Sequence, residues 1–328
     1  MDQLHANYPV GALADALEVS QSGFYAHRRK PERPPRRRRG IVGAGGWASR
    51  RLRDAQLAPL IAESFTRSRR SSGRPRVLAD LRALGERCGK NRVARLLRAQ
   101  GLRARQKRRF RPRTTEAEEG NIGGRQGGRA ESRHAHPIAE NWLAKVPAPD
   151  RPGLVWQSDF TCIETAEGWL YLAFTLDACT RRCVAHHCRA DMRGELTTDT
   201  LALAVARQPP PPGLPFGRLR AEWLHHSDRG SQYAAADFAR LAAASGLTLS
   251  MSRTGNPSDN ALAESFVATL KAECFADGLA PTRAAAELLA FDYLETFDNP
   301  HRRHSSLGYR SPLDFEKEMF PQNKKQTH

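Results

Sequence analysis

The sequence predicts an α/β fold, a mixed β-sheet flanked by helices, preceded by a basic helical region. Beyond residue 153, short apolar runs of strand length alternate with longer helical patterns, as in sheets covered by helices. Before residue 116, apolar residues recur at helical spacing in a strongly basic stretch. The chain of 328 residues is long enough for two or three domains.

The excess of positive charge lies entirely in the first third of the chain. Residues 1–115 carry 29 Lys and Arg against 8 Asp and Glu, a net charge of +21, whereas residues 116–328 carry 23 against 27, a net charge of −4. A run of like charge is usually a solvated face. An excess this large, with arginine well ahead of lysine, favours contacts with phosphates. We therefore expect nucleic acid as the partner.

The composition points to a cytoplasmic protein with no membrane partner. No stretch approaches 18 consecutive apolar residues, and the N-terminus lacks the charged-then-apolar pattern of a secretion signal. The six cysteines form no CxxC pair, and we expect reduced thiols. A zinc site is disfavoured because no second spaced pair accompanies the one tight group, Cys179, Cys183, His186, His187 and Cys188.

Two helix-turn-helix-like units are predicted within residues 1–115. The first has a helix over residues 10–17, a turn at residues 19–20 with Ser20 as N-cap, and a second helix over residues 21–27. A small helical hairpin without any groove contact fits the same pattern.

The second unit has a clearer division between an apolar face and a basic face. Its two helices are separated by a turn at residues 85–89, and the second helix stops at Gly101. The apolar positions are Val77, Leu81, Leu84, Val93, Leu96 and Leu97. The polar face of the second helix carries Lys90, Arg92, Arg95 and Arg98. A helix with one apolar and one basic stripe fits a groove-docking element.

The remaining segments divide the chain into regions. Residues 34–53 match no known pattern, and within them residues 36–39 followed by residues 43–46 are predicted to be flexible and basic. Residues 116–152 are predicted to form a linker that is rich in Gly and Arg at residues 116–130. A group of prolines then marks the boundary of a core over residues 153–316. A disordered tail is expected at residues 317–328.

The core is predicted to begin with three strands, the second and third forming a hairpin, and to alternate strands and helices afterwards. The predicted strands cover residues 154–163, 169–176, 182–188, 219–224 and 247–252. The predicted helices cover residues 196–206, 234–244, 260–274 and 282–297. Asp259 or Asn260 is expected to cap the third of them and Thr282 the last.

Three acidic residues form the candidate site. Asp159 lies in the first strand, Asp228 follows a later strand, and Glu264 lies near the start of the helix over residues 260–274. Each acid alone has an ordinary explanation as a turn residue, a helix-terminal acid or a solvated strand end. Two carboxylates about 4 Å apart repel by roughly 4 kcal/mol, so a cation would be needed to hold them together. Mg²⁺ and Mn²⁺ prefer such ligands, which points to phosphoryl transfer.

The residues around these acids resemble a known family. Residues from about 156 to 316 are similar to the catalytic core of bacterial insertion-sequence transposases of the IS-three family, OrfB type, in the retroviral-integrase (DDE) superfamily. The motifs that carry the resemblance are Trp156-Gln-Ser-Asp159-Phe-Thr, Glu167-Gly-Trp-Leu-Tyr-Leu-Ala173, His226-Ser-Asp-Arg-Gly-Ser-Gln-Tyr233, Ser250-Met-Ser-Arg-Thr-Gly-Asn256, Asp259-Asn-Ala-Leu-Ala-Glu-Ser-Phe266 and Arg302-Arg-His-Ser-Ser-Leu-Gly-Tyr309. Residues 10–28 and 74–102 resemble the family's N-terminal part more weakly.

The resemblance implies an RNase H-like integrase catalytic core and a DNA transposase that cleaves the ends of a mobile element and transfers the strands. It implies that Asp159, Asp228 and Glu264 are the catalytic triad and bind Mg²⁺ or Mn²⁺, as two ions. The implied partners are element ends and target DNA, further copies of the chain in a synaptic complex, and a companion product of an upstream reading frame. The cytoplasmic protein would be nucleoid-associated when bound to DNA.

The predicted helix over residues 260–274 has two distinct faces. At about 100° per residue, Leu262, Phe266 and Leu270 share one face, while Glu264 and Lys271 share the opposite one with an alanine between them. A lone lysine is usually an ordinary surface residue. The resemblance raises Lys271 to a DNA-binding candidate, because a basic residue on this face contacts the DNA end in the integrase superfamily.

Other candidate DNA contacts have equally plausible structural explanations. Arg229 can contact a phosphate or stabilise the turn around Asp228. Arg302 and Arg303, in the basic segment over residues 299–309, can touch DNA or fold back and cap the core. His225 and His226 are expected to orient the turn through hydrogen bonds and are not taken as metal ligands.

Two other functional classes stay open. One is a nuclease of the same fold that cuts without joining. The other is a catalytically silent DNA-binding remnant, against which the presence of all three acids argues.

Overall fold

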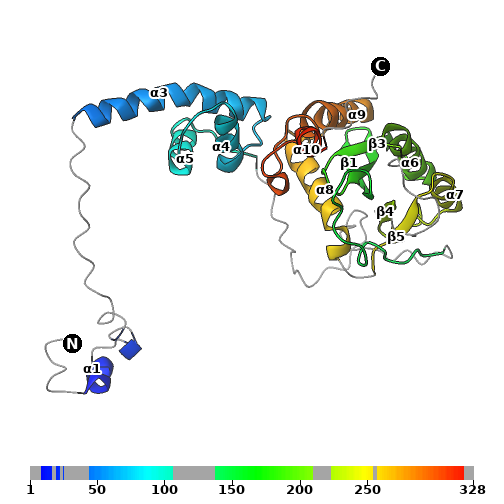
Figure 1. Cartoon of the computed structure of the whole chain (residues 1–328), viewed down its shortest axis with the longest axis horizontal. Helices are drawn as coiled ribbons and strands as arrows, with labels where there is room; N and C mark the ends of the chain where they lie inside the picture. The colour runs from blue at the N-terminus through cyan, green and yellow to red at the C-terminus, as the bar shows by residue number, and fades with distance from the viewer. Residues whose placement is uncertain are drawn as a thin grey trace. The chain divides into compact units, whose positions relative to one another are not determined.

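The computed structural model describes residues 9–16, 20–22, 25, 44–105, 137–209, 223–253 and 257–320, and of residues 44–48, 257 and 258 it describes the backbone alone. The chain divides into two compact units, residues 1–57 and residues 58–328 (Figure 1). Within the described ranges, no helix is both long enough and apolar enough to cross a membrane.

The first unit contains helix α1, Val10–Ala16, which buries Ala14. This helix matches the first half of the first predicted helix-turn-helix-like unit. Its predicted partner over residues 21–27 lies largely outside the described residues. The same holds for the linker residues 116–130, for residues 219–222 of a predicted strand, and for residues 321–328 of the predicted tail.

Helix α3, Ala44–Arg67, corrects one prediction. Residues 43–46 were expected to be flexible, but residues 44–46 are helical, although two of them are glycines, which disfavour helices. Further along the same helix, an apolar residue recurs every four positions and is buried, at Leu57, Ile61 and Phe65. Burial of this stripe stabilises the second half of the helix, whereas the described side chains at positions 49–52 are exposed.

Helices α4, Arg74–Ala83, and α5, Lys90–Ala99, confirm the second predicted unit. The predicted apolar positions are buried in both helices, with the exception of Leu84. Leu84 is 54% exposed because α4 ends at Ala83 and the chain turns at once through Gly85, whose φ is +79°. A positive φ of this kind favours glycine.

The core is a five-stranded mixed sheet with strand order β3-β2-β1-β4-β5. The strands are β1 Val155–Thr165, β2 Gly168–Asp177, β3 Cys183–Arg189, β4 Leu224–Ser227 and β5 Thr248–Met251. The first three pair antiparallel, whereas β4 pairs parallel to both β1 and β5. The predicted mixed sheet is therefore confirmed.

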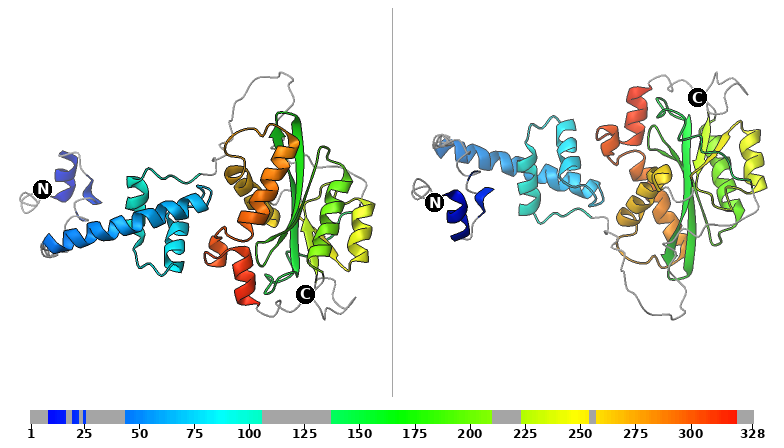
Figure 2. Two further views of the ribbon diagram at one scale, coloured as in Figure 1. Left: turned by 90° about the horizontal axis from the view of Figure 1, so that it is seen from above. Right: turned by 90° about the horizontal axis from the view of Figure 1, so that it is seen from below.

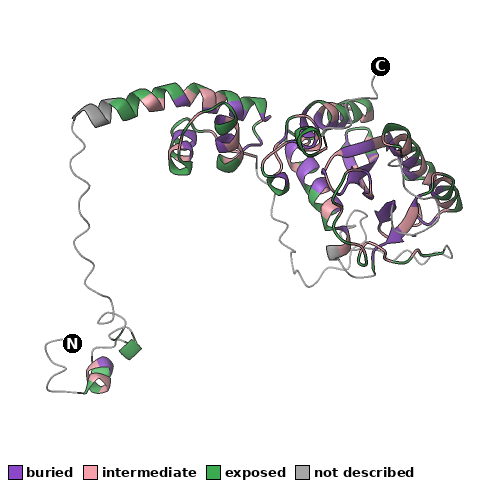
Figure 3. Cartoon of the chain, viewed as in Figure 1, coloured by how far each residue is buried: buried purple, intermediate pink, exposed green. Residues whose placement is uncertain are grey.

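Helices cover both faces of this sheet (Figures 1 and 2). Helices α6, Gly194–Arg207, and α7, Ala236–Ala244, lie on one face, and α8, Ala261–Glu273, and α9, Arg283–Phe291, lie on the other. Buried residues concentrate in the sheet and in the helix sides that face it (Figure 3). On the α8 face, the rings of Phe174 and Phe266 lie 4.6 Å apart.

The chain after α8 departs from the predictions in two places. Thr282 caps α9 as predicted, accepting a hydrogen bond from the N–H of Ala285 at 3.0 Å. The helix predicted to continue to residue 297 instead becomes a π-helix, Asp292–Asp298. Helix α10, Pro312–Met319, follows, so residues 317–319 of the predicted disordered tail are helical. The expected cap of α8 by Asp259 or Asn260 is also wrong, because Asn260 makes no capping bond and Asp259 binds Arg253.

A buried ion pair fixes the C-terminal end of α8. Arg302 donates to Glu273 from Nε at 2.8 Å and from Nη2 at 2.9 Å, and both side chains are less than a tenth exposed. Arg76 of α4 and the hydroxyl of Tyr293 also donate to Glu273. Burial would raise the pKa of Glu273, but the hydrogen bonds and charge of Arg302, with the charge of Arg76, hold it below its usual value.

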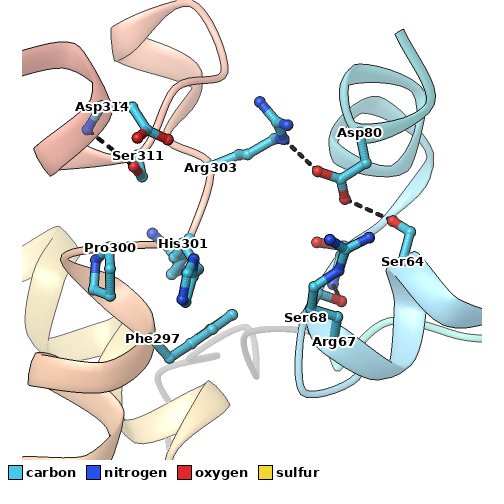
Figure 4. A pocket seen from close by; sticks show the side chains of 12 residues that line it. Ser64, Arg67, Ser68, Asp80, Phe297, Pro300, His301, Arg303, Ser311 and Asp314 are labelled. Atoms are coloured by element: carbon cyan, nitrogen blue, oxygen red, sulfur yellow. Dashed lines mark hydrogen bonds and ion pairs between the residues drawn. The ribbon is translucent and has the colours of Figure 1, made fainter. Parts of the chain in front are cut away.

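A second contact joins α4 to the segment that follows the π-helix (Figure 4). Asp80 accepts a hydrogen bond from the Ser64 hydroxyl at 2.6 Å and binds the Nε of Arg303. These side chains line a small polar cavity of about 120 Å³. Arg69 makes a third contact of this kind by donating a hydrogen bond from Nη1 to Oδ2 of Asp292 at 2.7 Å. Carboxylates of α4, α8 and the π-helix thus hold the helix-turn-helix-like helices and the core together within the second unit.

Replacing Glu273 with Gln is expected to lower the free energy of unfolding by about 3 kcal/mol, because the buried Arg302 guanidinium loses its two short hydrogen bonds to a carboxylate and keeps only Asp298, at 3.5 Å, as a counterion. Urea unfolding monitored by circular dichroism measures this change. The control is Asp277→Asn, which removes the exposed partner of Arg105 and should cost less than about 1 kcal/mol. Equal effects of the two variants would show that the buried pair is not special.

Candidate functional site

The pairing of β1 with β4 brings two of the three predicted acids to the same level of the sheet. The parallel register aligns Val155 with Leu224 and Gln157 with His226. Asp159 and Asp228 each lie two residues further along their strands. Strands pair about 4.8 Å apart and side chains alternate between faces, so the register directs these two carboxylates to one edge and one face.

Helix α8 reaches this edge through Asn260, the residue before its first turn. The side-chain amide of Asn260 donates a hydrogen bond to Oδ2 of Asp159 at 2.9 Å. Glu264 lies four residues later, on the same side of the helix as Asn260. It is exposed, and its charge acts on Asp159. The charges of Asp228 and Glu264 therefore both act on the Asp159 carboxyl.

The Asp159 carboxyl has an unusual electrostatic environment. Burial raises its pKa to about 7, with Asp228 as the next cause and Glu264 adding a smaller effect in the same direction. Its hydrogen-bond donors are neutral: the N–H of Phe160 at 2.8 Å and the amide of Asn260. Negative charge thus accumulates here, which is the condition that a divalent cation relieves.

The turn after β4 holds Asp228 through backbone contacts. The N–H of Gly230 donates to Oδ1 of Asp228 at 2.9 Å. A Cβ atom at position 230 would lie 2.9 Å from that same oxygen, so a larger residue would push the carboxylate away. The N–H of Tyr233 then closes the turn on the carbonyl of Gly230 at 3.0 Å.

The two histidines before Asp228 belong to the interior of the sheet. His225 bonds to the hydroxyl of Ser158 and His226 to that of Ser250, each at 2.8 Å. Burial lowers the pKa of His225 to about 3 and that of His226 to about 4, so both rings are neutral near pH 7. They were expected to orient the turn, and instead they bond to the neighbouring strands β1 and β5.

The outer face of α8 is as predicted from its spacing. Glu264, Ala268 and Lys271 are exposed, while Phe266 and Leu270 are buried against the sheet. Lys271 lines a groove of about 840 Å³ together with Ala268, residues 162–164 of β1 and the exposed ring of Trp169.

The other predicted DNA contacts occupy different places. Arg95 and Arg98 are exposed on α5 and Arg92 is partly exposed there, whereas Arg229 donates from Nε to the carbonyl of Ser252 at 2.8 Å. Arg302 is buried against Glu273 and Arg303 binds Asp80, so both arginines contact the protein itself. Of the alternatives for the segment over residues 299–309, folding back onto the core describes Arg302, whereas Arg303 contacts α4.

The cysteines and histidines of the described residues are the remaining candidates for metal binding. Among the residues that the structure describes, no group of three or more His, Cys, Asp or Glu side chains is already arranged to hold a metal ion. All six cysteines are free thiols, and burial raises the pKa of Cys183 and Cys188, to about 12 for Cys188.

Sequence reasoning did not assign Asn260 and Gly230 to the site. Asn260 was interpreted as a helix cap, yet its position one turn before Glu264 is a signal that both side chains leave the helix on one side. For Gly230, a glycine two residues after an acid in a turn is the available signal.

Comparisons with known proteins agree with this architecture. The family "Integrase core domain" matches residues 149–257, a second family of the same description matches residues 245–312, and the family "HTH-like domain" matches residues 51–110. The chain is therefore an integrase-core protein with a helix-turn-helix-like region.

Sequence similarity to insertion-sequence transposases over nearly the whole chain identifies its family. The chain is 31% identical to transposase InsF for insertion sequence IS3A of Escherichia coli strain K12, over 96% of both chains. It is 38% identical to the insertion element IS600 31 kDa protein of Shigella sonnei, over 82% of this chain and 89% of that protein. The chain belongs to the IS3 family of insertion-sequence transposases.

Two solved structures show more distant likeness. A chain of the simian T-cell lymphotropic virus intasome in complex with PP2A regulatory subunit B56 gamma is 16% identical, with a TM-score of 0.41 over 56% of this chain and 60% of that chain. The HTLV-2 integrase catalytic core domain in complex with magnesium is 13% identical, with a TM-score of 0.37 over 51% of this chain and 98% of that chain.

Replacing Asp159 with Asn should stabilise the metal-free protein at pH 8, by about 4 kcal/mol for a pKa raised by about three units. A carboxyl with a raised folded-state pKa makes stability fall as pH rises from about 4 to about 7. The gain should therefore vanish near pH 4. Urea unfolding in EDTA at both pH values measures it.

The matched control is Asp237→Asn on the exposed surface of α7, which should change stability by less than about 0.5 kcal/mol at either pH. A destabilised Asp159→Asn protein at pH 8 would contradict the electrostatic account of the site.

Proposed function

We propose that this protein is a DNA transposase that cleaves the ends of a mobile element and joins them to target DNA by metal-dependent phosphoryl transfer. The observation that carries the proposal is the β1–β4 register, because Asp159 and Asp228 each lie two residues beyond the pair Gln157 and His226. Asn260, at the start of α8, then bonds to Asp159. Membership of a transposase family supports the same activity.

In this proposal Asp159, Asp228 and Glu264 hold Mg²⁺ or Mn²⁺, as two ions. These residues fit a divalent cation because negative charge accumulates at Asp159. Burial raises the pKa of Asp159 most, and the carboxylates of Asp228 and Glu264 raise it further. Glu264 lies one turn from Asn260 on the exposed side of α8, and its charge acts on Asp159, which supports its place in the ligand set. When bound, such ions activate water and stabilise the charge on the attacking and leaving oxygens of an in-line displacement.

The protein's own groups supply positioning. The Phe160 N–H and the Asn260 amide orient Asp159, and the Gly230 N–H orients Asp228. In the first step, water adds to the phosphorus and the element's 3′-oxygen leaves as a hydroxyl. In the second step, that hydroxyl attacks a target phosphodiester and the target's own 3′-oxygen leaves. No covalent enzyme intermediate is needed.

DNA would be bound by several regions of the chain. Residues 1–115 form the basic DNA-binding region in this proposal, residues 116–152 the linker, residues 153–316 the catalytic core and residues 317–328 the tail. Arg92, Arg95 and Arg98 on α5 would contact phosphates away from the site, and Lys271 and Arg229 would contact them beside it. Arg302 and Arg303 would reach DNA only by leaving Glu273 and Asp80.

The proposed reaction also implies an assembly. Two element ends must be held together for coupled joining, so copies of this chain would act as an oligomer in a synaptic complex. A companion protein from an upstream reading frame would assist in end recognition. The proposed location is the cytoplasm, on the nucleoid when DNA is bound.

Asp228→Asn is expected to abolish cleavage and strand transfer, by at least about 100-fold, while leaving DNA affinity within about twofold, because the substitution removes one ligand charge and little of the DNA-binding surface. Labelled element ends measure cleavage, and ends with a preformed 3′-hydroxyl measure joining. Asp237→Asn is the control. Retained cleavage in Asp228→Asn would refute its role, and cleavage without joining by the natural sequence would identify a nuclease.

Replacing Arg92, Arg95 and Arg98 together with Gln should flatten the dependence of log K on log salt by about 2.7, if each contacts one phosphate of duplex DNA. Fluorescence anisotropy across a salt series measures the slope. Arg193, Arg207 and Arg240 in the catalytic core provide a control with the same loss of charge. Equal slopes for both triple variants would rule out α5 as a DNA-contacting helix.

A further inference from the structure

Tyr233 is a buried side chain beside the site to which neither the family match nor the proposed reaction gives a role. It is 1% exposed and lies at the end of the turn that carries Asp228. Its ring is 5.4 Å from that of Phe238 in an edge-to-face arrangement and 6.2 Å from the ring of His225. These contacts fix the ring, and with it the direction of the hydroxyl.

The hydroxyl of Tyr233 has no hydrogen-bond partner among the described residues. Buried hydroxyl groups are nearly always hydrogen-bonded, because an unpaired one loses its bonds to water without replacement. Another buried tyrosine of this chain follows the rule, since the hydroxyl of Tyr293 donates to Glu273 at 2.9 Å. The unpaired donor of Tyr233 is therefore an exception that calls for a partner.

The turn itself places the Tyr233 ring beside Asp228, because a Cβ atom at position 230 would lie 2.9 Å from Oδ1 of Asp228 and 3.6 Å from Cδ2 of Tyr233. Burial raises the pKa of Tyr233 well above its ordinary value, and the charges of Asp159 and Asp228, in that order, add to the effect. The phenol thus keeps its proton and can serve as a donor near both acids. Asp159 already accepts one bond at each oxygen, from Phe160 and Asn260, and a carboxylate has capacity for about four.

We propose that Tyr233 is a positioning residue whose hydroxyl donates a hydrogen bond to the Asp159 carboxylate when that carboxylate binds a divalent cation. The inference rests on the proposed function, because it assigns Tyr233 to the support of a metal ligand. Ligating carboxylates are commonly held by a further hydrogen bond, which fixes their orientation and strengthens metal binding. In the metal-free protein the same hydroxyl is a buried donor without a partner.

This assignment predicts two effects of opposite sign in Tyr233→Phe. The metal-free variant should melt about 2 °C higher than the natural protein, because the unpaired hydroxyl is gone and the ring contacts remain. Its dissociation constant for Mn²⁺ should rise about 10-fold. Differential scanning calorimetry in EDTA measures the first effect, and titration calorimetry of the full chain with Mn²⁺ alone measures the second.

Tyr293→Phe is the matched control, because it removes a buried hydroxyl that is already bonded. It should melt lower than the natural protein and bind Mn²⁺ with unchanged affinity. An unchanged Mn²⁺ affinity in Tyr233→Phe would overturn the inference. A lower melting temperature of the metal-free Tyr233→Phe variant would also overturn it, since it would mean that the hydroxyl has a partner without metal.

Asp228→Asn separates this inference from the proposed function. If the natural protein binds Mn²⁺, Asp228→Asn does not, and Tyr233→Phe binds like the natural protein, then the role of Tyr233 is wrong and the metal site stands. If the natural protein binds Mn²⁺ no better than Asp228→Asn, both proposals fail together.

Discussion

The short parallel pairing of β1 with β4 is the constraint on which the site depends. Only three residues of each strand are in register, yet this register aligns two acids that are 69 positions apart in the sequence. The pairing is held from beneath by apolar contacts, including the edge-to-face contact of Trp156 and Trp223 at 5.2 Å. A slip of one residue would send one carboxylate to the opposite face of the sheet.

Helix α8 is held at both ends, and each attachment has a different chemical character. At its start, Asn260 bonds to Asp159, so the helix is positioned by a neutral amide at the place where negative charge accumulates. At its end, Glu273 is enclosed by Arg302 and Arg76, so the helix is fixed by paired charges. Glu264 lies between these two points. The contacts of Asn260 and Glu273 therefore set the position of the helix turn that carries Glu264.

The sequence predicted those parts of the fold that local patterns determine. Strands of the core and the two faces of α8 follow from apolar spacing, which needs only neighbouring residues. The π-helix after Phe291 was missed because long-range packing of its buried side chains decides it. The start of α3 was missed because its two glycines disfavour a helix. The three acids could be named from motifs. The same motifs contain Asn260 and Tyr233 but give no role to either, and the contact of Asn260 is with Asp159, 101 positions away.

The arginines that join the helix-turn-helix-like helices to the core change the meaning of the charge count. Arg69, Arg76 and Arg105 all belong to the basic first third of the chain, and they bind Asp292, Glu273 and Asp277. Their positive charge is therefore compensated within the molecule. The field that an approaching polyanion meets is weaker and more localised than the formal excess suggests, and it is centred on the arginines that face solvent.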